Sequence, residues 1–247
     1  MTLLLRNPHS VIAALDRRPG DVLEVRLPPG KPSEAWRPVV ESARERQIPI
    51  KTELALPPDR RGGKSERQGA ACAIVREQAG ALLETLWTAP PPQTGDLWVA
   101  LDCLQDPHNV GAVFRSAAFF GVRGVVLTKD RSAPLSSTVY DVASGGVESV
   151  PFVQTPNLAS ALKAAKSAGV WVLGSSERAA KDVSQIPHDR PWLLVIGNEE
   201  QGLRRLSQEL CDEMCRITPQ GDVGSLNASV AAGVLMSALR SVLAPGQ

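Results

Sequence analysis

Short apolar runs separated by helix-compatible stretches fill residues 97–247, and this alternation constrains the fold more than any other feature. The runs are LWVAL (97–101), GVVLT (124–128), VWVLG (170–174), WLLVI (192–196) and a weaker MCRIT (214–218). Helix-compatible stretches lie between or after them, at 111–120, 158–168, 203–211 and 225–242. Nearly continuous apolar strands that alternate with helices predict an α/β fold with a parallel sheet covered on both faces.

A smaller α+β unit is predicted to precede this sheet. Its pattern predicts helices at 8–17 and 33–47 and strands at 22–27, 48–54 and 70–77. The stretch TAPPPQTGD (88–96) follows, and its three consecutive prolines favour an extended spacer. The predicted organisation is therefore an N-terminal domain at 1–87, a linker at 88–96 and a larger domain at 97–247.

The charge is distributed unevenly although the net charge is only +1. Residues 1–86 carry 14 Lys and Arg against 11 Asp and Glu. Four of these cations lie in one polar, glycine-rich loop at 57–69, which is a solvated surface loop or a phosphate-binding loop. The candidates for phosphate contact are Arg60, Arg61, Lys64 and Arg67.

Several classes of protein are excluded by pattern. No apolar run approaches the roughly 20 residues that span a bilayer, and Arg6 and Asn7 interrupt the only N-terminal apolar run, so neither a signal peptide nor membrane association is expected. The four cysteines show no pairing pattern, which favours a reducing, cytoplasmic location. Phosphate-loop, dinucleotide-binding, zincin and serine-hydrolase motifs are absent, and the three histidines are too dispersed for a metal site.

Three polar clusters follow predicted strands, at the edge where parallel α/β sheets bind ligands. The first is DPHNVGAVFR (106–115), where Asn109 is predicted to cap a helix beginning at Val110 and Gly111 permits a close approach. Spacing alone does not settle whether Arg115 faces the same cleft as Asn109. Read alone, the cluster is equally a helix cap followed by an exposed arginine.

The other two clusters are VIGNEEQGL (195–203) and GDVGSLNASVAAGV (221–234). The former follows a strand, and by itself it is equally a polar turn. The latter is a glycine loop that leads into a helix, and Ser225 and Asn227 are predicted in the first turn of that helix. Its small residues permit close packing, either within the fold or across a dimer.

Together, in this order, the clusters resemble the SpoU (TrmH) family of RNA ribose 2′-O-methyltransferases, within the SPOUT superfamily. The resemblance covers residues 97–243 and rests on three family motifs, which match Asn109, Gly111 and Arg115; Gly197, Asn198, Glu199 and Gly202; and Ile217, Gly221, Ser225, Leu226, Asn227, Ser229, Val230 and Ala231. Residues 106–152 are most similar to the branch that methylates a guanosine of 23S rRNA, the large-subunit RNA. In that branch the N-terminal domain is a ribosomal-protein-like RNA-binding domain, which the present segment resembles weakly.

Three positions depart from the family pattern. Thr218 stands where the third motif usually has proline, and Pro219 is displaced by one residue. Gly224 stands where larger polar residues are common, and Arg67 begins RQG where the branch often has HQG. The first two positions bear on the cofactor loop, and the third leaves the RNA target open.

The resemblance implies a C-terminal trefoil knot that holds S-adenosylmethionine, a homodimer formed beside this site, and an RNA substrate. By match to the family, the cofactor would be held by Leu173, Gly174, Ser175, Ser176, Ile196, Gly197, Asn198, Ile217, Ser225, Leu226, Asn227 and Ala228. No metal is implied, because the sulfonium already activates the methyl group. The product would be S-adenosylhomocysteine.

The resemblance also implies catalytic roles for Arg115, Asn109, Glu199, Ser225 and Asn227. The corresponding arginine has been proposed as the general base, although a guanidinium pKa above ~12 opposes that role. The alternative is that Arg115 clamps the neighbouring phosphate in a bidentate manner and polarises the 2′-hydroxyl. Asn109 and Glu199 would orient Arg115 or the ribose, while Ser225 and Asn227 would shape the pocket.

Two alternative functions remain open at the level of sequence. One is the same chemistry on a tRNA or on another rRNA site, including the one whose methylation confers thiostrepton resistance. The other is a non-catalytic RNA-binding or ribosome-assembly factor. The target nucleotide, and whether the substrate is naked RNA or an assembling subunit, are not fixed by the sequence.

Overall fold

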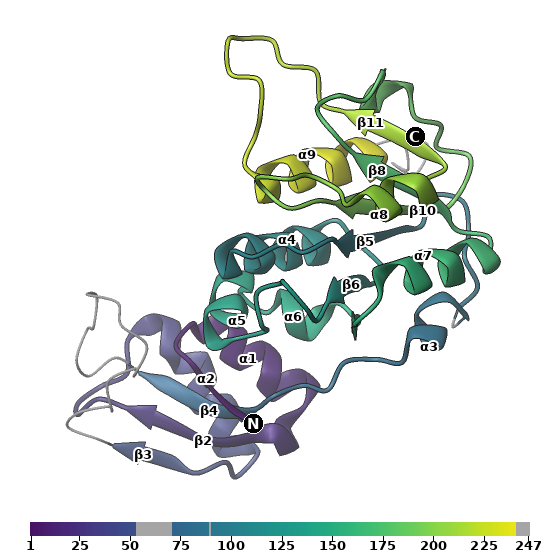
Figure 1. The fold of residues 1–247 in the computed structure, drawn as a ribbon. Helices are drawn as coiled ribbons and strands as arrows, with labels where there is room; N and C mark the ends of the chain where they lie inside the picture. The colour runs from purple at the N-terminus through teal and green to yellow at the C-terminus, as the bar shows by residue number, and fades with distance from the viewer. Residues whose placement is uncertain (53–70, 89, 241–247) are drawn as a thin grey trace, which may run out of the picture.

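A computed structural model describes residues 1–52, 71–88 and 90–240 and contains two β-sheets (Figure 1). A four-stranded sheet belongs to the N-terminal part, and a seven-stranded sheet forms the centre of the remainder. No helix in the described ranges is long and apolar enough to cross a membrane. The four residues predicted to contact phosphate in the 57–69 loop lie outside the described residues.

The N-terminal sheet has the strand order β1-β4-β2-β3 and is packed against two helices. β4 is antiparallel to both β1 and β2, while β2 and β3 are parallel. Its elements are β1 (Thr2–Leu5), α1 (Pro8–Arg17), η1 (Pro19–Asp21), β2 (Val22–Leu27), η2 (Glu34–Trp36), α2 (Arg37–Glu45), β3 (Ile50–Thr52) and β4 (Cys72–Arg76). The predicted helix 8–17 and strand 22–27 are confirmed at the same bounds.

The single helix expected over 33–47 is instead two elements. A 3-10 turn, η2, occupies residues 34–36, and α2 begins only at Arg37. Pro38 explains the break, because a proline lacks the N–H that a helix interior requires and is tolerated only in the first turn. β1, at the start of the chain, was not anticipated from the sequence.

The seven-stranded sheet is parallel and has the order β7-β6-β5-β10-β8-β11-β9. Its strands are β5 (Leu97–Leu101), β6 (Val125–Thr128), β7 (Phe152–Thr155), β8 (Trp171–Ser175), β9 (Lys181–Asp182), β10 (Trp192–Ile196) and β11 (Glu213–Arg216). The helices are α3 (Leu83–Thr88), α4 (Pro107–Phe119), α5 (Ser137–Ala143), α6 (Gly146–Ser149), α7 (Leu158–Ser167), α8 (Arg205–Leu210) and α9 (Ala228–Arg240), with a 3-10 turn η3 (Val183–Gln185). All five predicted strands are present.

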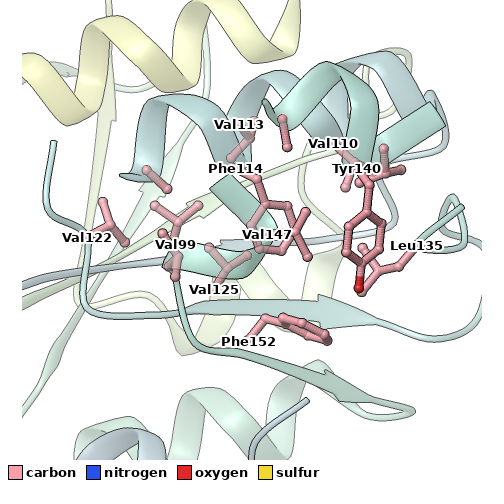
Figure 2. Close-up of a cluster of buried hydrophobic side chains, with 14 of the residues drawn as sticks. Val99, Val110, Val113, Phe114, Val122, Val125, Leu135, Tyr140, Val147 and Phe152 are labelled. Atoms are coloured by element: carbon pink, nitrogen blue, oxygen red, sulfur yellow. The ribbon is translucent and has the colours of Figure 1, made fainter. Parts of the chain in front are cut away.

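Both faces of this sheet are buried, as the apolar runs predicted. Along β5, Leu97, Val99 and Leu101 belong to one hydrophobic cluster, while Trp98 and Ala100 belong to a second. Figure 2 shows part of the first cluster, where Val113 and Phe114 of α4 pack over the sheet. The ring of Phe114 meets Phe152 of β7 edge to face, with the ring centroids 6.0 Å apart. Helices α3 and α7 cover the second cluster.

The end of the chain differs from its prediction. Sequence pattern placed a helix over 225–242, whereas α9 begins at Ala228. The side-chain oxygen of Asn227 accepts hydrogen bonds from the backbone N–H groups of Ser229 and Val230, so Asn227 caps the helix instead of lying in its first turn. The short elements β7, β9, α3, α5 and α6 were also missed.

The two parts meet at what we call the junction, which joins residues 4–18 to residues 137–148. Arg18 and Glu148 form two hydrogen bonds of 2.7 Å, and the Glu148 side chain is only 1% exposed. The Asp141 carboxylate accepts the backbone N–H groups of Arg6 and Asn7. Both carboxylates accept charge-assisted hydrogen bonds, which are stronger than bonds between neutral groups. The N-terminal part is therefore attached to the larger part by specific polar contacts as well as by the chain itself.

Candidate functional site

Strand order gathers the polar loops at one edge of the large sheet. β5, β10, β8 and β11 are consecutive neighbours in the sheet, and all run in the same direction. The segments that follow their carboxyl ends therefore converge, and these segments carry all three sequence clusters. The structure thus brings together loops whose contacting residues lie 90 positions apart in the chain.

The first two clusters are joined directly by a hydrogen bond. Asn109 Nδ2 donates to Glu199 Oε1 at 2.8 Å, and Asn109 is only 6% exposed although it is polar. The predicted cap role of Asn109 is wrong: α4 begins at Pro107, and Asp106 caps it by accepting the backbone N–H of His108. Proline favours the first helical position, so the helix starts earlier and frees the Asn109 side chain to reach the second cluster.

The loop that carries Glu199 is folded back on itself. Asn198 and Gly202 exchange backbone hydrogen bonds of 3.0 and 2.9 Å. Asn198 Oδ1 also accepts the N–H groups of Glu200 and Gln201, and its Nδ2 donates to the Cys103 carbonyl. At Gly197 an added Cβ would lie 2.3 Å from a backbone atom of Gly202, so only glycine permits this fold.

Asp102, a residue that the sequence did not single out, fixes the end of the same loop. Its side chain is fully buried at the end of β5, and it accepts hydrogen bonds from Arg204 Nε at 2.6 Å and from the Arg204 N–H at 3.1 Å. A buried carboxylate needs such partners. An aspartate directly after an apolar strand was the available signal. Together with Asn109 and the Cys103 carbonyl, Asp102 fixes the orientation of the Glu199 loop.

Arg115 is not part of this network. It lies on α4 six residues after Asn109, which places the two side chains about 120° apart around the helix. Arg115 is exposed and forms no hydrogen bond or ion pair with any residue in the described ranges. Its guanidinium is therefore free to bind an external anion, but the structure does not bring it against Glu199.

The predicted cofactor residues fall into two environments. Leu173, Gly174 and Ile196 are buried in β8 and β10, and Ile217 is half-buried just after β11. Two serines at the end of β8 tie neighbouring strands together: Ser175 Oγ donates to the Val195 carbonyl, and the Ser176 N–H donates to the Cys215 carbonyl.

The remaining cofactor candidates lie on the loop that connects β11 to α9. Ser225, Leu226 and Asn227 are exposed there, and Ala228 is the first residue of α9. This loop stands out from the sheet at the top of Figure 1. Its exposed backbone groups are available to a ligand as hydrogen-bond donors and acceptors.

The cysteines near this edge are poor nucleophiles. Burial raises the pKa values of the Cys211 and Cys215 thiols to about 12, so both remain protonated at neutral pH. Within the described ranges no cluster of three His, Cys, Asp or Glu side chains could hold a metal ion.

A shallow apolar groove lies beside the site, between α4 and α9. It is lined by Ala112, Ser116, Phe120, Val230, Gly233 and Val234. Phe119, next to the groove on α4, is 83% exposed, and Val230 is 50% exposed. Phe119, Val230 and Val234 therefore leave apolar side chains exposed along this groove.

The fold defines a class of protein. The chain superposes on the SpoU methyltransferase AviRb from Streptomyces viridochromogenes with a TM-score of 0.78 over 99% of this chain and 92% of that one, at 24% identity. An rRNA methyltransferase from Sinorhizobium meliloti gives a TM-score of 0.76 over 98% and 88%, at 22% identity. The architecture is thus the parallel α/β fold of the SPOUT methyltransferases.

Sequence comparison then identifies the family. Residues 96–237 match the SpoU rRNA Methylase family, and the chain belongs to it. A protein from Nitrosomonas europaea named 23S rRNA (guanosine-2'-O-)-methyltransferase RlmB is 34% identical over 92% of this chain and 87% of its own. The protein of the same name from Pseudomonas aeruginosa is 36% identical over 92% of both chains. The resemblance predicted from the three motifs is confirmed.

Proposed function

We propose that this chain transfers the methyl group of S-adenosylmethionine to the ribose 2′-hydroxyl of a guanosine in 23S rRNA. The observation that carries this proposal is the hydrogen bond between Asn109 and Glu199, which joins the first and second family motifs at the ligand-binding edge of the sheet. The relatives named for this activity match more than nine-tenths of the chain, including its N-terminal part. That coverage favours the 23S rRNA target over a tRNA target.

The site suits the cofactor through its backbone and small side chains. The structure of AviRb carries AdoMet, the same compound. In this chain the ends of β8 and β10 and the loop at 217–227 would hold it. When bound, it supplies a methyl group already activated by a sulfonium.

The chain's own residues then have to place the hydroxyl and remove its proton. A ribose hydroxyl is a weak nucleophile at neutral pH, so in-line positioning is a large part of catalysis. The hydrogen bond from the buried Asn109 side chain orients the exposed Glu199 carboxylate at this edge. Arg115, which has no partner among the described residues, binds the phosphate beside the target ribose and polarises its hydroxyl.

A labelling experiment tests this function. The purified protein is incubated with methyl-labelled S-adenosylmethionine and, separately, unmodified 23S rRNA, small-subunit rRNA and tRNA, followed by nuclease mapping. We expect label on one ribose of 23S rRNA, and a loss of at least a hundredfold in Arg115→Ala. Near-normal turnover in Arg115→Lys would contradict bidentate clamping. Label on tRNA would reassign the substrate, and cofactor binding without label would point to a ribonucleoprotein substrate.

We also propose a homodimer formed through the α4–α9 groove. The occupant is the same surface of a second copy, because the groove combines small side chains that allow helices to approach closely with exposed Phe119 and Val230. Light scattering should give twice the chain mass for the wild type and a monomer for Val230→Glu. A monomeric wild type at micromolar concentration would contradict the dimer.

The C-terminal segment is proposed to form the trefoil knot of the SPOUT superfamily. Two features support this proposal. β10 lies between β5 and β8 in the sheet, although it follows both in sequence. After β11, which is near one edge of the sheet, the chain returns to the centre, where α9 packs on β5 and β10. Tracing the chain through 173–228 in an experimental density map tests this topology.

The N-terminal sheet is proposed as the RNA-binding domain. A cytoplasmic location is proposed because the substrate is rRNA.

A further inference from the structure

The loop between β11 and α9 is held to the rest of the molecule almost only at its two ends. Residues 218–227 are all exposed. Within the described ranges, residues 219–226 form no hydrogen bond. At the C-terminal end, Asn227 caps α9. The conformation of the loop therefore depends strongly on how its N-terminal end is fixed.

Thr218 fixes that end through one carboxylate. Its backbone N–H donates to Asp182 Oδ2 at 3.0 Å, and its hydroxyl donates to the same oxygen at 2.5 Å. Hydrogen bonds to an ionised acceptor are roughly twice as strong as those between neutral groups. The loop is thus anchored at Thr218 by two charge-assisted bonds.

Asp182 is itself held in a fixed orientation. It ends the edge strand β9, which pairs with β11, and it caps η3. Its other oxygen, Oδ1, accepts the N–H and hydroxyl of Ser184, and its own N–H donates to the side chain of Gln185. Val183 and Ile186, one and four residues after Asp182, are buried in the same hydrophobic cluster as residues of α9. Oδ2 is consequently directed at Thr218 by a well-anchored segment.

The residue at position 218 is one of the departures from the family pattern. The third motif usually has proline there, and a proline has neither an N–H nor a hydroxyl to donate. A proline would restrict the loop through its ring, which fixes φ near −65°. Threonine at this position lacks the ring constraint, but it has a backbone N–H and a hydroxyl. Both of these groups donate to Asp182.

We propose that Asp182 and Thr218 form a clamp that orders the 217–227 loop and so sets the affinity for S-adenosylmethionine. The inference rests on the proposed function, because this loop is one wall of the proposed cofactor site. Both are positioning residues: they act on the backbone that binds the cofactor. Without the clamp, the loop must be ordered at the moment of binding, and that entropic cost raises the dissociation constant.

Thr218→Val tests the clamp, because it removes the hydroxyl from an exposed side chain and keeps its shape. We expect the Kd for S-adenosylmethionine, measured by calorimetry, to rise about three- to tenfold, the effect of losing one charge-assisted hydrogen bond. The KM for RNA should not change. In the protein without ligand, amide hydrogen exchange at 220–226 should become faster.

Thr85→Val is the matched control, since it makes the same substitution at an exposed threonine on α3, whose hydroxyl donates to the Leu82 carbonyl. It should leave the Kd within twofold of wild type. In a Thr218→Pro background both donors are gone, so Asp182→Ala should then change the Kd by no more than about twofold.

Two results would overturn the clamp. One is a wild-type Kd and wild-type exchange rates in Thr218→Val, and the other is an equal rise of the Kd in Thr85→Val, which would show that the effect does not depend on the contact with Asp182. If the wild type binds no S-adenosylmethionine at all, the proposed function fails. The exchange comparison in ligand-free protein still decides whether the clamp orders the loop.

Discussion

The junction and the 217–227 loop are held in opposite ways. The junction combines a buried ion pair with a carboxylate that accepts two backbone donors, whereas the loop is anchored by Thr218 at one end and Asn227 at the other. The first arrangement resists displacement, and the second leaves an exposed backbone for a ligand to bind. Changes at the junction should therefore alter stability, and changes in the loop should alter cofactor affinity.

The largest effect is expected from Glu148→Ala at the junction. Removing this carboxylate leaves Arg18, whose side chain is 11% exposed, without its buried partner. Breaking a buried pair in this way costs about 3 kcal/mol or more of the free energy of unfolding, measured by urea denaturation. The Kd for S-adenosylmethionine should be unchanged.

A double variant, Arg18→Met with Glu148→Leu, serves as its control. It removes both charges, so it should recover most of the lost stability. If the double variant were as unstable as Glu148→Ala, lost packing and not an unpaired charge would explain the effect.

A smaller loss of stability is expected from Gly145→Ala. Gly145 has φ +92°, and an added Cβ would lie 2.9 Å from Ala13 Cβ across the junction. Backbone strain and crowding together should cost about 1–3 kcal/mol of unfolding free energy. Gly221→Ala in the loop is the matched control, because nothing lies within 4 Å of its added Cβ. Equal losses in both variants would contradict the contrast between the two regions.

The two regions should also respond to acid in opposite senses. Burial raises the pKa of Asp141 at the junction, whereas hydrogen bonds from Thr218 and Ser184 lower the pKa of Asp182. The folded state binds a proton at Asp141 more readily than the unfolded chain does, so stability from this group rises as the pH falls through its raised pKa, above 3.8. The contribution of Asp182 is present above 3.8 and is lost only as the pH falls through its lowered pKa.

Carbon-detected NMR titration of the two carboxyl groups measures these directions. Between pH 6 and about pH 4, wild type should gain stability relative to Asp141→Asn, while its difference from Asp182→Asn stays constant. A pKa for Asp182 above that of Asp141 would reverse the assignment.

The smallest change in stability is expected from Thr218→Val. The side chain is exposed, so its free energy of unfolding should differ from wild type by less than about 0.5 kcal/mol. Urea denaturation of this variant beside Glu148→Ala completes the comparison. A loss of stability comparable to that of Glu148→Ala would show that the loop supports the fold.

The sequence predicted the large sheet well, because strands buried on both faces leave nearly continuous apolar runs such as those at 97–101 and 192–196. It missed elements whose register depends on distant partners. β1 is stabilised by β4 and by Ser137, more than a hundred residues away, and β9 is only two residues long. Neither leaves a periodic pattern of its own.

For the candidate site, the sequence proposed residues but could not predict how they are arranged. Three motifs identified Asn109, Glu199 and Arg115, yet spacing could not show that the first two meet while the third points elsewhere. Asp102 and Asp182 were missed because each works through a partner in another loop, Arg204 or Thr218. Such pairs exist only after the strands have been placed side by side.

The junction also has a consequence for the order in which the molecule assembles. Its polar partners, such as Ser10 with Tyr140 and Asn7 with Ser144, are separated by 130 to 137 residues. A chain that leaves the ribosome at roughly 5–20 residues per second presents its first helix on the order of ten seconds before these partners have been synthesised. During that interval Arg18 has no Glu148 to pair with. The polar groups of the N-terminal segment therefore lack their native partners during this interval, and incompletely packed intermediates of this kind are prone to misfolding.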